Sequence, residues 1–226
     1  MHFNEKYDYI QLSRESTDGG SRVYVELNGN KVPSVTTILS RTGDKSGLKK
    51  WEERVGLVEA TRIRNEAANL GTLMHHHLEC HACGLERPIG NNFIRQLSGK
   101  MADQIIERGL VNVNEAWGME ISLCYPGLYA GTADLCGVHK GDSAIMDYKT
   151  AKKMKTREMI EDYFLQLSAY AMCHNEQYGT DIKKGVIFMV DRDLKFQEFI
   201  LEGNDFQAKT DSWLRRLETF LLLNQS

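Results

Sequence analysis

The sequence predicts a single α/β (α+β) domain in which helices flank a mixed central sheet. Two observations support this fold class. The 226 residues are enough for one sizeable hydrophobic core. Helical patterns, three strands, a helix, two strands and a final helix then follow one another along the chain. We expect one domain over 1–226, with a hairpin and helices in 1–110 and the sheet-bearing core in 111–226.

The N-terminal half begins with β structure and continues as helices. Alternating residues at 23–27 precede Asn28-Gly29-Asn30, a strong hairpin-turn sequence, which leads into Lys31-Val32. Ser34 is a good N-cap for a short helix. Helical periodicity then predicts four further helices, separated at glycines, over about 46–55, 57–70, 71–83 and 91–108.

The C-terminal half carries the strands of the predicted sheet. Runs of β-type residues bounded by turn residues predict them, and apolar periodicity predicts the helices between and after them. The predicted strands are 116–123, 128–138, 143–148, 184–190 and 196–201, and the predicted helices are 156–178 and 205–223.

Two acids face each other in the central hairpin. A tight turn at Lys140-Gly141 sets Asp134 directly opposite Asp147 and puts Lys149 on the same face as Asp147. Like charges opposite each other destabilise a sheet unless a cation lies between them. A divalent metal such as Mg²⁺ would serve. The alternative is an ordinary cross-strand salt bridge made by Lys149.

A histidine-rich helix is the second notable segment. Periodicity over Gly71-Thr72-Leu73-Met74-His75-His76-His77 predicts that His77 is buried, that His76 is exposed and that His75 lies at the edge of the apolar stripe. Cys80 and Cys83 lie near these histidines. Structural zinc sites need a second pair of ligands, and none follows, so we expect helix packing and no zinc.

Other candidate functional residues surround the hairpin in sequence. Gln166 and Tyr170 share one face of the following helix. Glu120, on the preceding strand, is either a further metal ligand or a surface acid. Two basic clusters, which are either phosphate-binding or solvated faces, include Lys49 in the first and Lys152 and Lys153 in the second.

The composition bears on nucleic-acid binding, on membrane insertion and on the cellular compartment. The net charge of −3 gives no support to general nucleic-acid binding, so a phosphate-rich partner must be met by a local basic patch. No apolar run approaches the roughly 20 residues of a membrane span. Five cysteines without paired spacing fit a reducing compartment, and the N-terminus lacks the order of a signal peptide. We expect a cytoplasmic protein that does not contact membranes.

Five motifs in order resemble a known nuclease family. Gly71-Thr72-x-x-His75, Glu120, Gly131-x-x-Asp134, Asp147-x-Lys149 and Gln166-x-x-x-Tyr170 are together similar to the RecB-type branch of the PD-(D/E)xK nuclease superfamily. The opening segment 33–39, followed by Leu48-Lys49-Lys50-Trp51 and Arg54-Val55-Gly56, resembles the mitochondrial genome maintenance exonucleases and their phage-encoded relatives. The likeness covers about residues 20–200. Ala133 replaces the proline that names the superfamily.

The resemblance implies a fold and a set of roles. It implies a restriction-endonuclease-like sheet, with Mg²⁺ or Mn²⁺ held by Asp134, Asp147 and the main-chain carbonyl of Tyr148, and with His75 as an extra ligand. Lys149 would orient the attacking water and help deprotonate it. The remaining motif residues, Gln166 and Tyr170, would steady the active site and the nucleic-acid backbone.

The activity implied by the resemblance is that of a metal-dependent DNA exonuclease acting on single-stranded or frayed ends. Replication or recombination proteins are its expected partners, and a phage-encoded protein in a host cytoplasm fits this role. A flap endonuclease with the same site and a non-catalytic DNA-end-binding subunit are the alternatives. Because only Cys173 follows Gln166, the cysteines that hold an iron–sulfur cluster in some relatives are missing, and we expect none.

The helix that begins after Ser34 offers one further hypothesis. A helix N-terminus with free amides and hydroxyls can bind phosphate, so Ser34, Thr36 and Thr37 are candidates for gripping a DNA strand. The alternative is a capped helix that only packs in the core.

Overall fold

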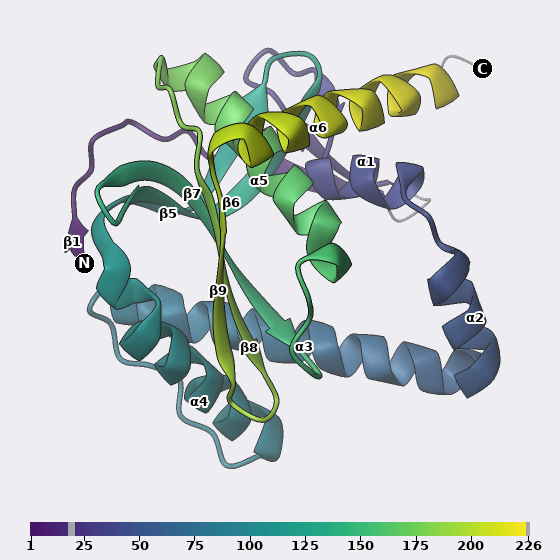
Figure 1. Cartoon of the computed structure of the whole chain (residues 1–226), viewed down its shortest axis with the longest axis vertical. Coiled ribbons are helices and arrows are strands. Elements are labelled where there is room, and N and C mark those ends of the chain that lie inside the picture. The colour runs from purple at the N-terminus through teal and green to yellow at the C-terminus, as the bar shows by residue number, and fades with distance from the viewer. Residues whose placement is uncertain (18–20, 225–226) are drawn as a thin grey trace.

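A six-stranded mixed sheet forms the centre of the computed structural model, which describes residues 1–17 and 21–224 (Figure 1). In spatial order its strands are β1 (His2–Phe3), β5 (Val113–Tyr125), β6 (Tyr129–His139), β7 (Asp142–Ala151), β8 (Gly185–Asp191) and β9 (Phe196–Leu201). A separate antiparallel sheet contains β2 (Ser13–Ser16), β3 (Arg22–Val25) and β4 (Lys31–Pro33). The predicted mixed α/β fold with a mixed central sheet is confirmed.

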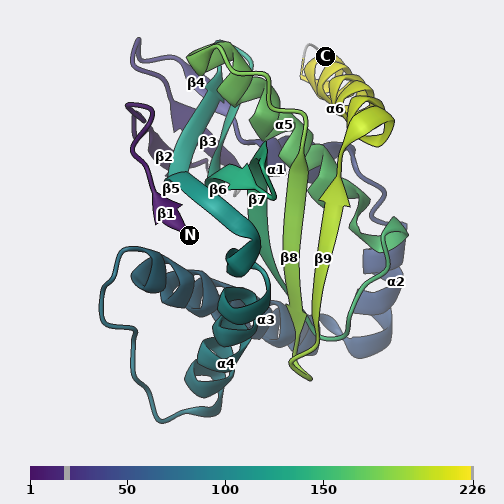
Figure 2. The same cartoon turned by 60° about the vertical axis from the view of Figure 1, so that its left-hand side comes forward.

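Helices cover both faces of the central sheet (Figures 1 and 2). The helices are α1 (Val35–Thr42), α2 (Ser46–Val55), α3 (Leu57–Ala82), α4 (Phe93–Arg108), α5 (Glu161–Tyr178) and α6 (Gly203–Leu223), with 3₁₀ turns at Leu110–Asn112 and Glu158–Ile160. One apolar cluster joins the sheet to α1, α5 and α6, and it contains the buried Phe164 and Trp213. The other joins the sheet to α3 and α4, and it contains Met74 and Met101.

The register of the central hairpin agrees with the prediction over the paired residues. The ladder between β6 and β7 runs from His139 and Asp142 to Leu135 and Met146. Asp134 and Asp147 occupy the next position of the same register, which agrees with the prediction that they lie opposite each other. The Asp134 carboxylate accepts a hydrogen bond from the main-chain amide of Tyr148 (2.7 Å). Because β7 and β8 are parallel, the chain must return from one end of the sheet to the other between them. The helix α5 lies in this connection and passes the part of β7 that contains Asp147.

The long helix α3 corrects another prediction. We expected two helices separated at Gly71, but α3 continues through this residue. A glycine inside a helix costs only about 1 kcal/mol relative to alanine, which tertiary packing readily offsets. A Cβ at Gly71 would lie 3.7 Å from Thr150 Oγ1, so this turn of α3 passes close to β7.

Two short strands were not predicted from the sequence. β1 pairs with β5, and β2 pairs with β3. Both short strands contain exposed residues without apolar alternation, so no pattern in the sequence indicates that they are strands. Within residues 1–17 and 21–224, no helix has the length and apolar character required to span a membrane.

Candidate active site

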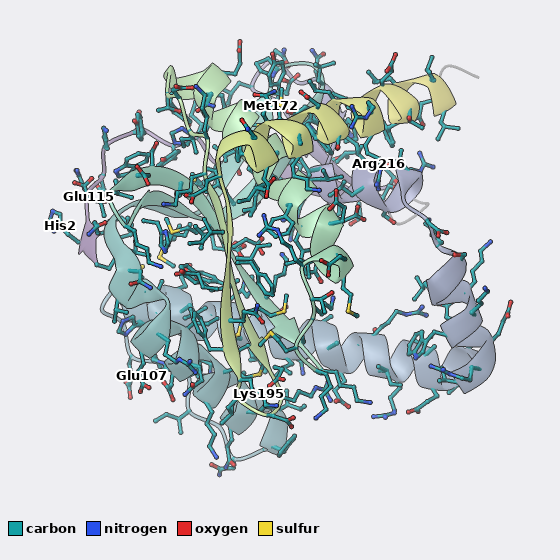
Figure 3. The ribbon with its side chains drawn as sticks, viewed as in Figure 1. His2, Glu107, Glu115, Met172, Lys195 and Arg216 are labelled. Carbon is teal, nitrogen blue, oxygen red and sulfur yellow. The ribbon has the colours of Figure 1, made fainter. Side chains whose placement is uncertain are left out.

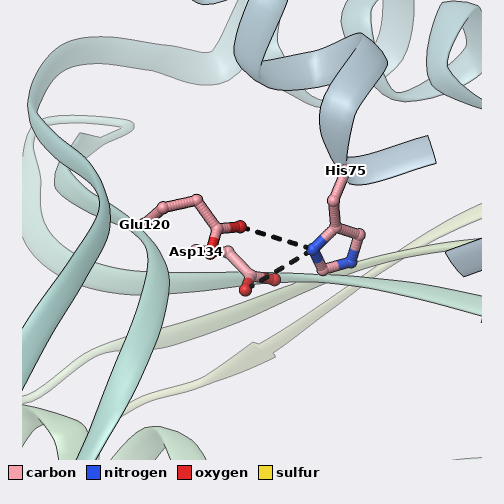
Figure 4. A group of neighbouring side chains, drawn as sticks. All are labelled: His75, Glu120 and Asp134. Carbon is pink, nitrogen blue, oxygen red and sulfur yellow. Dashed lines mark ion pairs between the residues drawn. The ribbon is translucent and has the colours of Figure 1, made fainter. Parts of the chain in front are cut away.

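Three side chains from three different elements converge beside the central hairpin (Figure 4). His75 extends from α3, Glu120 from β5 and Asp134 from β6. His75 Nδ1 lies 3.6 Å from Glu120 Oε1 and 3.7 Å from Asp134 Oδ1, and the three potential ligand atoms all lie within 4.8 Å of one another. One imidazole and two carboxylates make a suitable ligand set for a divalent cation.

The backbone of β5 places Glu120 opposite Asp134. Met119 pairs with Leu135 and Ile121 pairs with Ala133, so Glu120 occupies the position between these pairs. Its φ of 48° lies in the left-handed region, which is uncommon for a residue other than glycine and costs on the order of 1–3 kcal/mol. Such a conformation persists only where the surrounding structure imposes it. The sequence contains no signal for it.

Asp147 and Lys149 form a close ion pair at the end of β7. Lys149 Nζ lies 2.6 Å from Asp147 Oδ2, and the two side chains share one face as predicted. Asp147 is only 2% exposed. Asp147 thus contacts Lys149, and it is not one of the three side chains whose possible ligand atoms lie within 4.8 Å of one another.

Helix α5 supports this pair from one face of the sheet. Gln166 Nε2 donates to Asp147 Oδ1 and to the Tyr170 hydroxyl, each at 3.3 Å. Both residues are buried. The ring of Tyr170 passes directly over Gly131 of β6, where a Cβ would overlap it. Glycine at 131 is therefore a steric requirement for the position of Tyr170.

Gly131→Ala is expected to destabilise the protein by about 1–3 kcal/mol, because the new methyl group displaces a buried ring. Chemical denaturation measures the loss. Gly47→Ala is the control, since nothing lies within 4 Å of the added Cβ. If steric overlap is the cause, Gly131→Ala adds little when Tyr170 is already replaced by leucine. Additive losses in the double variant contradict this explanation.

The main-chain carbonyl of Tyr148 orients His75. It lies 2.9 Å from His75 Nε2, and because a carbonyl only accepts hydrogen bonds, Nε2 must carry a proton in this contact. In neutral His75, Nδ1 then keeps its lone pair directed toward Glu120 and Asp134 (Figure 4). The other two histidines behave as periodicity predicts, with His77 buried and His76 exposed.

Burial and mutual attraction set the protonation of the cluster. Burial raises the pKa of Asp134, although His75 and Lys149 oppose this shift. Burial also raises the pKa of Asp147 to about 6 against the attraction of Lys149. For His75, burial lowers the pKa, but Asp134 and Glu120 outweigh it and raise the pKa to about 9. Without a metal, a proton on His75 therefore compensates the buried carboxylates.

The candidate DNA-binding residues lie apart from these contacts. Ser34 is buried, and its hydroxyl accepts from the Thr37 amide and contacts Thr36 Oγ1, each at 3.0 Å. These contacts match a helix cap. The three lysines are exposed: Lys49 on α2, Lys152 beside a pocket of about 190 Å³ between α3 and the end of β7, and Lys153 in an ion pair with Asp193.

One neighbour of the site was missed by the sequence analysis. The ring of Tyr163 on α5 lies against the Lys149 ammonium, with 4.9 Å between Nζ and the ring centroid. The spacing Tyr163-x-x-Gln166-x-x-x-Tyr170 could have identified it, because these positions share one helix face.

Sequence comparison finds similarity to mitochondrial genome maintenance exonuclease 1. The chain is 26% identical to the protein of Mus musculus over 236 residues, covering 96% of the chain and 66% of the relative. It is 24% identical to that of Homo sapiens over 221 residues, covering 91% and 62%. The chain thus spans slightly less than two thirds of the length of the curated relatives it matches.

Comparison with solved structures gives only low TM-scores. SSO0001 superimposes with a TM-score of 0.45 at 17% identity, over 85% of this chain and 76% of that one. An alkaline exonuclease (LHK-Exo) from Laribacter hongkongensis gives a TM-score of 0.32 at 16% identity, over 68% and 82%. No family model matches the chain. The sequence similarity to two exonucleases supports a relationship to nucleases.

Proposed function

We propose that this protein is a metal-dependent DNA exonuclease of the RecB-type PD-(D/E)xK branch, acting on single-stranded or frayed ends. The observation that carries the proposal is the convergence of His75, Glu120 and Asp134 beside the Asp147 and Lys149 ion pair. Such a site combines metal ligands with a cation next to the scissile phosphate. Similarity to two proteins named as exonucleases supports the same activity.

The residues of the site would divide the chemistry between them. His75, Asp134 and Asp147 would hold Mg²⁺ or Mn²⁺, with Glu120 and the Tyr148 carbonyl as further candidate ligands. The bound ion would supply hydroxide near neutral pH and neutralise charge that grows on the phosphate. Lys149 Nζ would orient the attacking water, and its positive charge would favour deprotonation of that water.

The helix α5 would keep these groups aligned during the reaction. Gln166 holds one oxygen of Asp147 while Lys149 contacts the other. Tyr170 in turn receives a hydrogen bond from Gln166. Through these contacts the two α5 side chains would steady the active site, and they would also lie beside the nucleic-acid backbone.

We make further proposals about the domain organisation, the path of the DNA, the location of the protein and its partners. Residues 1–226 would act as one domain, since both apolar clusters combine residues from before and after residue 110. The DNA would pass the side chains of Thr36, Thr37, Lys49, Lys152 and Lys153, and the buried Ser34 would contribute by capping the helix behind the two threonines. We place the protein in a cytoplasm, with replication or recombination proteins as partners.

A single-stranded DNA labelled at its 5′ or 3′ end tests the proposal in Mg²⁺, Mn²⁺ or chelator. We expect cleavage only with metal, and a loss of about 10²-fold or more in Lys149→Ala, which lacks the charge beside the water. Lys183→Ala is the control, because Lys183 is exposed and pairs with Asp181 before β8 begins. The exposed Lys195 (Figure 3) is less suitable, since it lies two residues from Asp193, the ion-pair partner of Lys153. Wild-type rates in Lys149→Ala would overturn the mechanism.

A closed circular single strand separates the alternatives. An exonuclease needs a free end and leaves the circle intact, whereas an endonuclease cuts it. Metal-independent binding to ends without any cleavage would instead indicate the non-catalytic subunit. We expect intact circles and degraded linear strands.

A further inference from the structure

The aromatic ring of Tyr163 is a second contact for the Lys149 ammonium. Lys149 Nζ lies 2.6 Å from Asp147 Oδ2 on one side and 4.9 Å from the centroid of the Tyr163 ring on another. This distance is within the range in which a cation is attracted to the face of an aromatic ring. The Lys149 side chain is 19% exposed, so its contact with the ring is partly shielded from water.

A second lysine fixes the ring. Lys155 Nζ donates a hydrogen bond to the Tyr163 hydroxyl (2.9 Å) and lies 4.9 Å from the same ring centroid. Lys155 belongs to the segment that connects β7 with α5, while Tyr163 lies in the first turn of α5. The ring thus joins the start of the helix to the strand end that carries Lys149.

Asp147 has two roles in the proposed site, and a second contact for Lys149 becomes important for this reason. Asp147 is both the ion-pair partner of Lys149 and, in the proposed function, a metal ligand. A divalent cation on Asp147 would draw on the same negative charge and weaken its attraction for Lys149. A flexible lysine side chain would then lose its alignment, because holding it still costs conformational entropy. The face of the Tyr163 ring has no ligand atom for a metal, and its hydroxyl accepts from Lys155, so the ring keeps its attraction for the ammonium.

We propose that Tyr163 is a positioning residue that holds Lys149 in line with the attacking water while Asp147 binds metal. The inference rests on the proposed nuclease function. It concerns the ring itself and not the hydroxyl, since the hydroxyl is occupied by Lys155. Tyr163 is thereby distinct from Gln166 and Tyr170, which act through Asp147.

Two substitutions at one position test the role of the ring. Tyr163→Phe keeps the ring and removes the hydroxyl, whereas Tyr163→Leu removes both. We expect Tyr163→Leu to lower kcat about tenfold at unchanged KM, and Tyr163→Phe to stay within about twofold of wild type. Phe196→Leu is the matched control, because it removes another partly buried ring, with Arg108 5.2 Å from its centroid. The control should leave kcat unchanged.

A measurement independent of cleavage keeps this inference separate from the proposed function. In protein with ¹³C-labelled lysine ε-carbons, the ring current of Tyr163 should shift the Lys149 methylene protons, assigned as the signal missing in Lys149→Arg. The shift should persist in Tyr163→Phe and vanish in Tyr163→Leu. A wild-type protein that shows the shift but cleaves no DNA refutes the nuclease function while the ring contact stands.

Three results would overturn the role of Tyr163. An unchanged lysine shift in Tyr163→Leu shows that the ring does not contact Lys149. Equal losses of kcat in the phenylalanine and leucine variants assign the effect to the hydroxyl. A rise in KM at constant kcat shows that the ring binds DNA, for example by stacking on a base, and does not position the lysine.

Discussion

Asp134→Asn is expected to lower metal-dependent cleavage by on the order of 10³-fold while the protein stays folded. Asparagine keeps the shape of the side chain and an oxygen that can accept from the Tyr148 amide. It removes the negative charge that faces His75 and Glu120, so the cluster loses one of its two anionic ligands. The rate measured on end-labelled single-stranded DNA in saturating Mg²⁺ reports the effect.

Stability measurements separate this loss from misfolding. Burial raises the pKa of Asp134, so the ionised carboxylate is less favourable in the folded protein than in water. A neutral isostere should therefore leave the free energy of unfolding in chelator unchanged or slightly raised. Asp181→Asn, which neutralises an exposed acid, is the matched control and should keep full activity. Retained cleavage in Asp134→Asn would remove this residue from the metal site.

The free energy of unfolding in chelator is expected to fall by up to about 3 kcal/mol as the pH rises from 6.5 to 9. The cause is His75, whose pKa is raised from 6.5 to about 9 by Asp134 and Glu120 despite burial. A raised pKa means that the folded state holds the proton more tightly. The resulting stabilisation is complete below pH 6.5 and disappears as the pH passes 9. Urea denaturation at a series of pH values measures it.

A divalent metal should reverse this pH dependence. Metal and proton compete for the same imidazole, so metal affinity rises as His75 deprotonates. Saturating Mg²⁺ or Mn²⁺ should therefore stabilise the protein more at pH 9 than at pH 6.5, by an amount that grows with metal concentration. In chelator, the free energy of unfolding of His75→Asn should not fall between pH 6.5 and pH 9. The same fall in His75→Asn would assign it to other groups.

Local patterns were sufficient for most of the secondary structure. The hairpin turn at Lys140-Gly141 set the β6 and β7 register, because a tight turn determines which residues pair. Ser34 began α1, and its hydroxyl caps the Thr37 amide. The prediction that a helix ends at Gly71 was wrong, because the free-energy cost of a glycine within a helix is small compared with the stabilisation from packing α3 on the sheet. Periodicity correctly separated buried His77 from exposed His76.

The candidate site required more than local patterns. The residue types and the strand alternation were enough to put Asp147 and Lys149 on one face. No pattern indicated that Glu120 adopts a positive φ, because this depends on pairing with a strand that follows it. The Tyr163 contact with Lys149 likewise depends on how α5 crosses the end of β7.

The sequence by itself determined the strand pairing of the β6–β7 hairpin and which faces of the helices are buried. It also identified the charged residues of this hairpin. These features follow from turn chemistry and from side-chain periods of 2 and 3.6 residues. The family resemblance implied that His75 and Asp134 share a metal site, but only the tertiary structure decided that Glu120 joins them, because its place depends on a positive φ and on the pairing of β5 with β6. Packing of α3, β5 and β6 brings them together, and such long-range placement has no local signature.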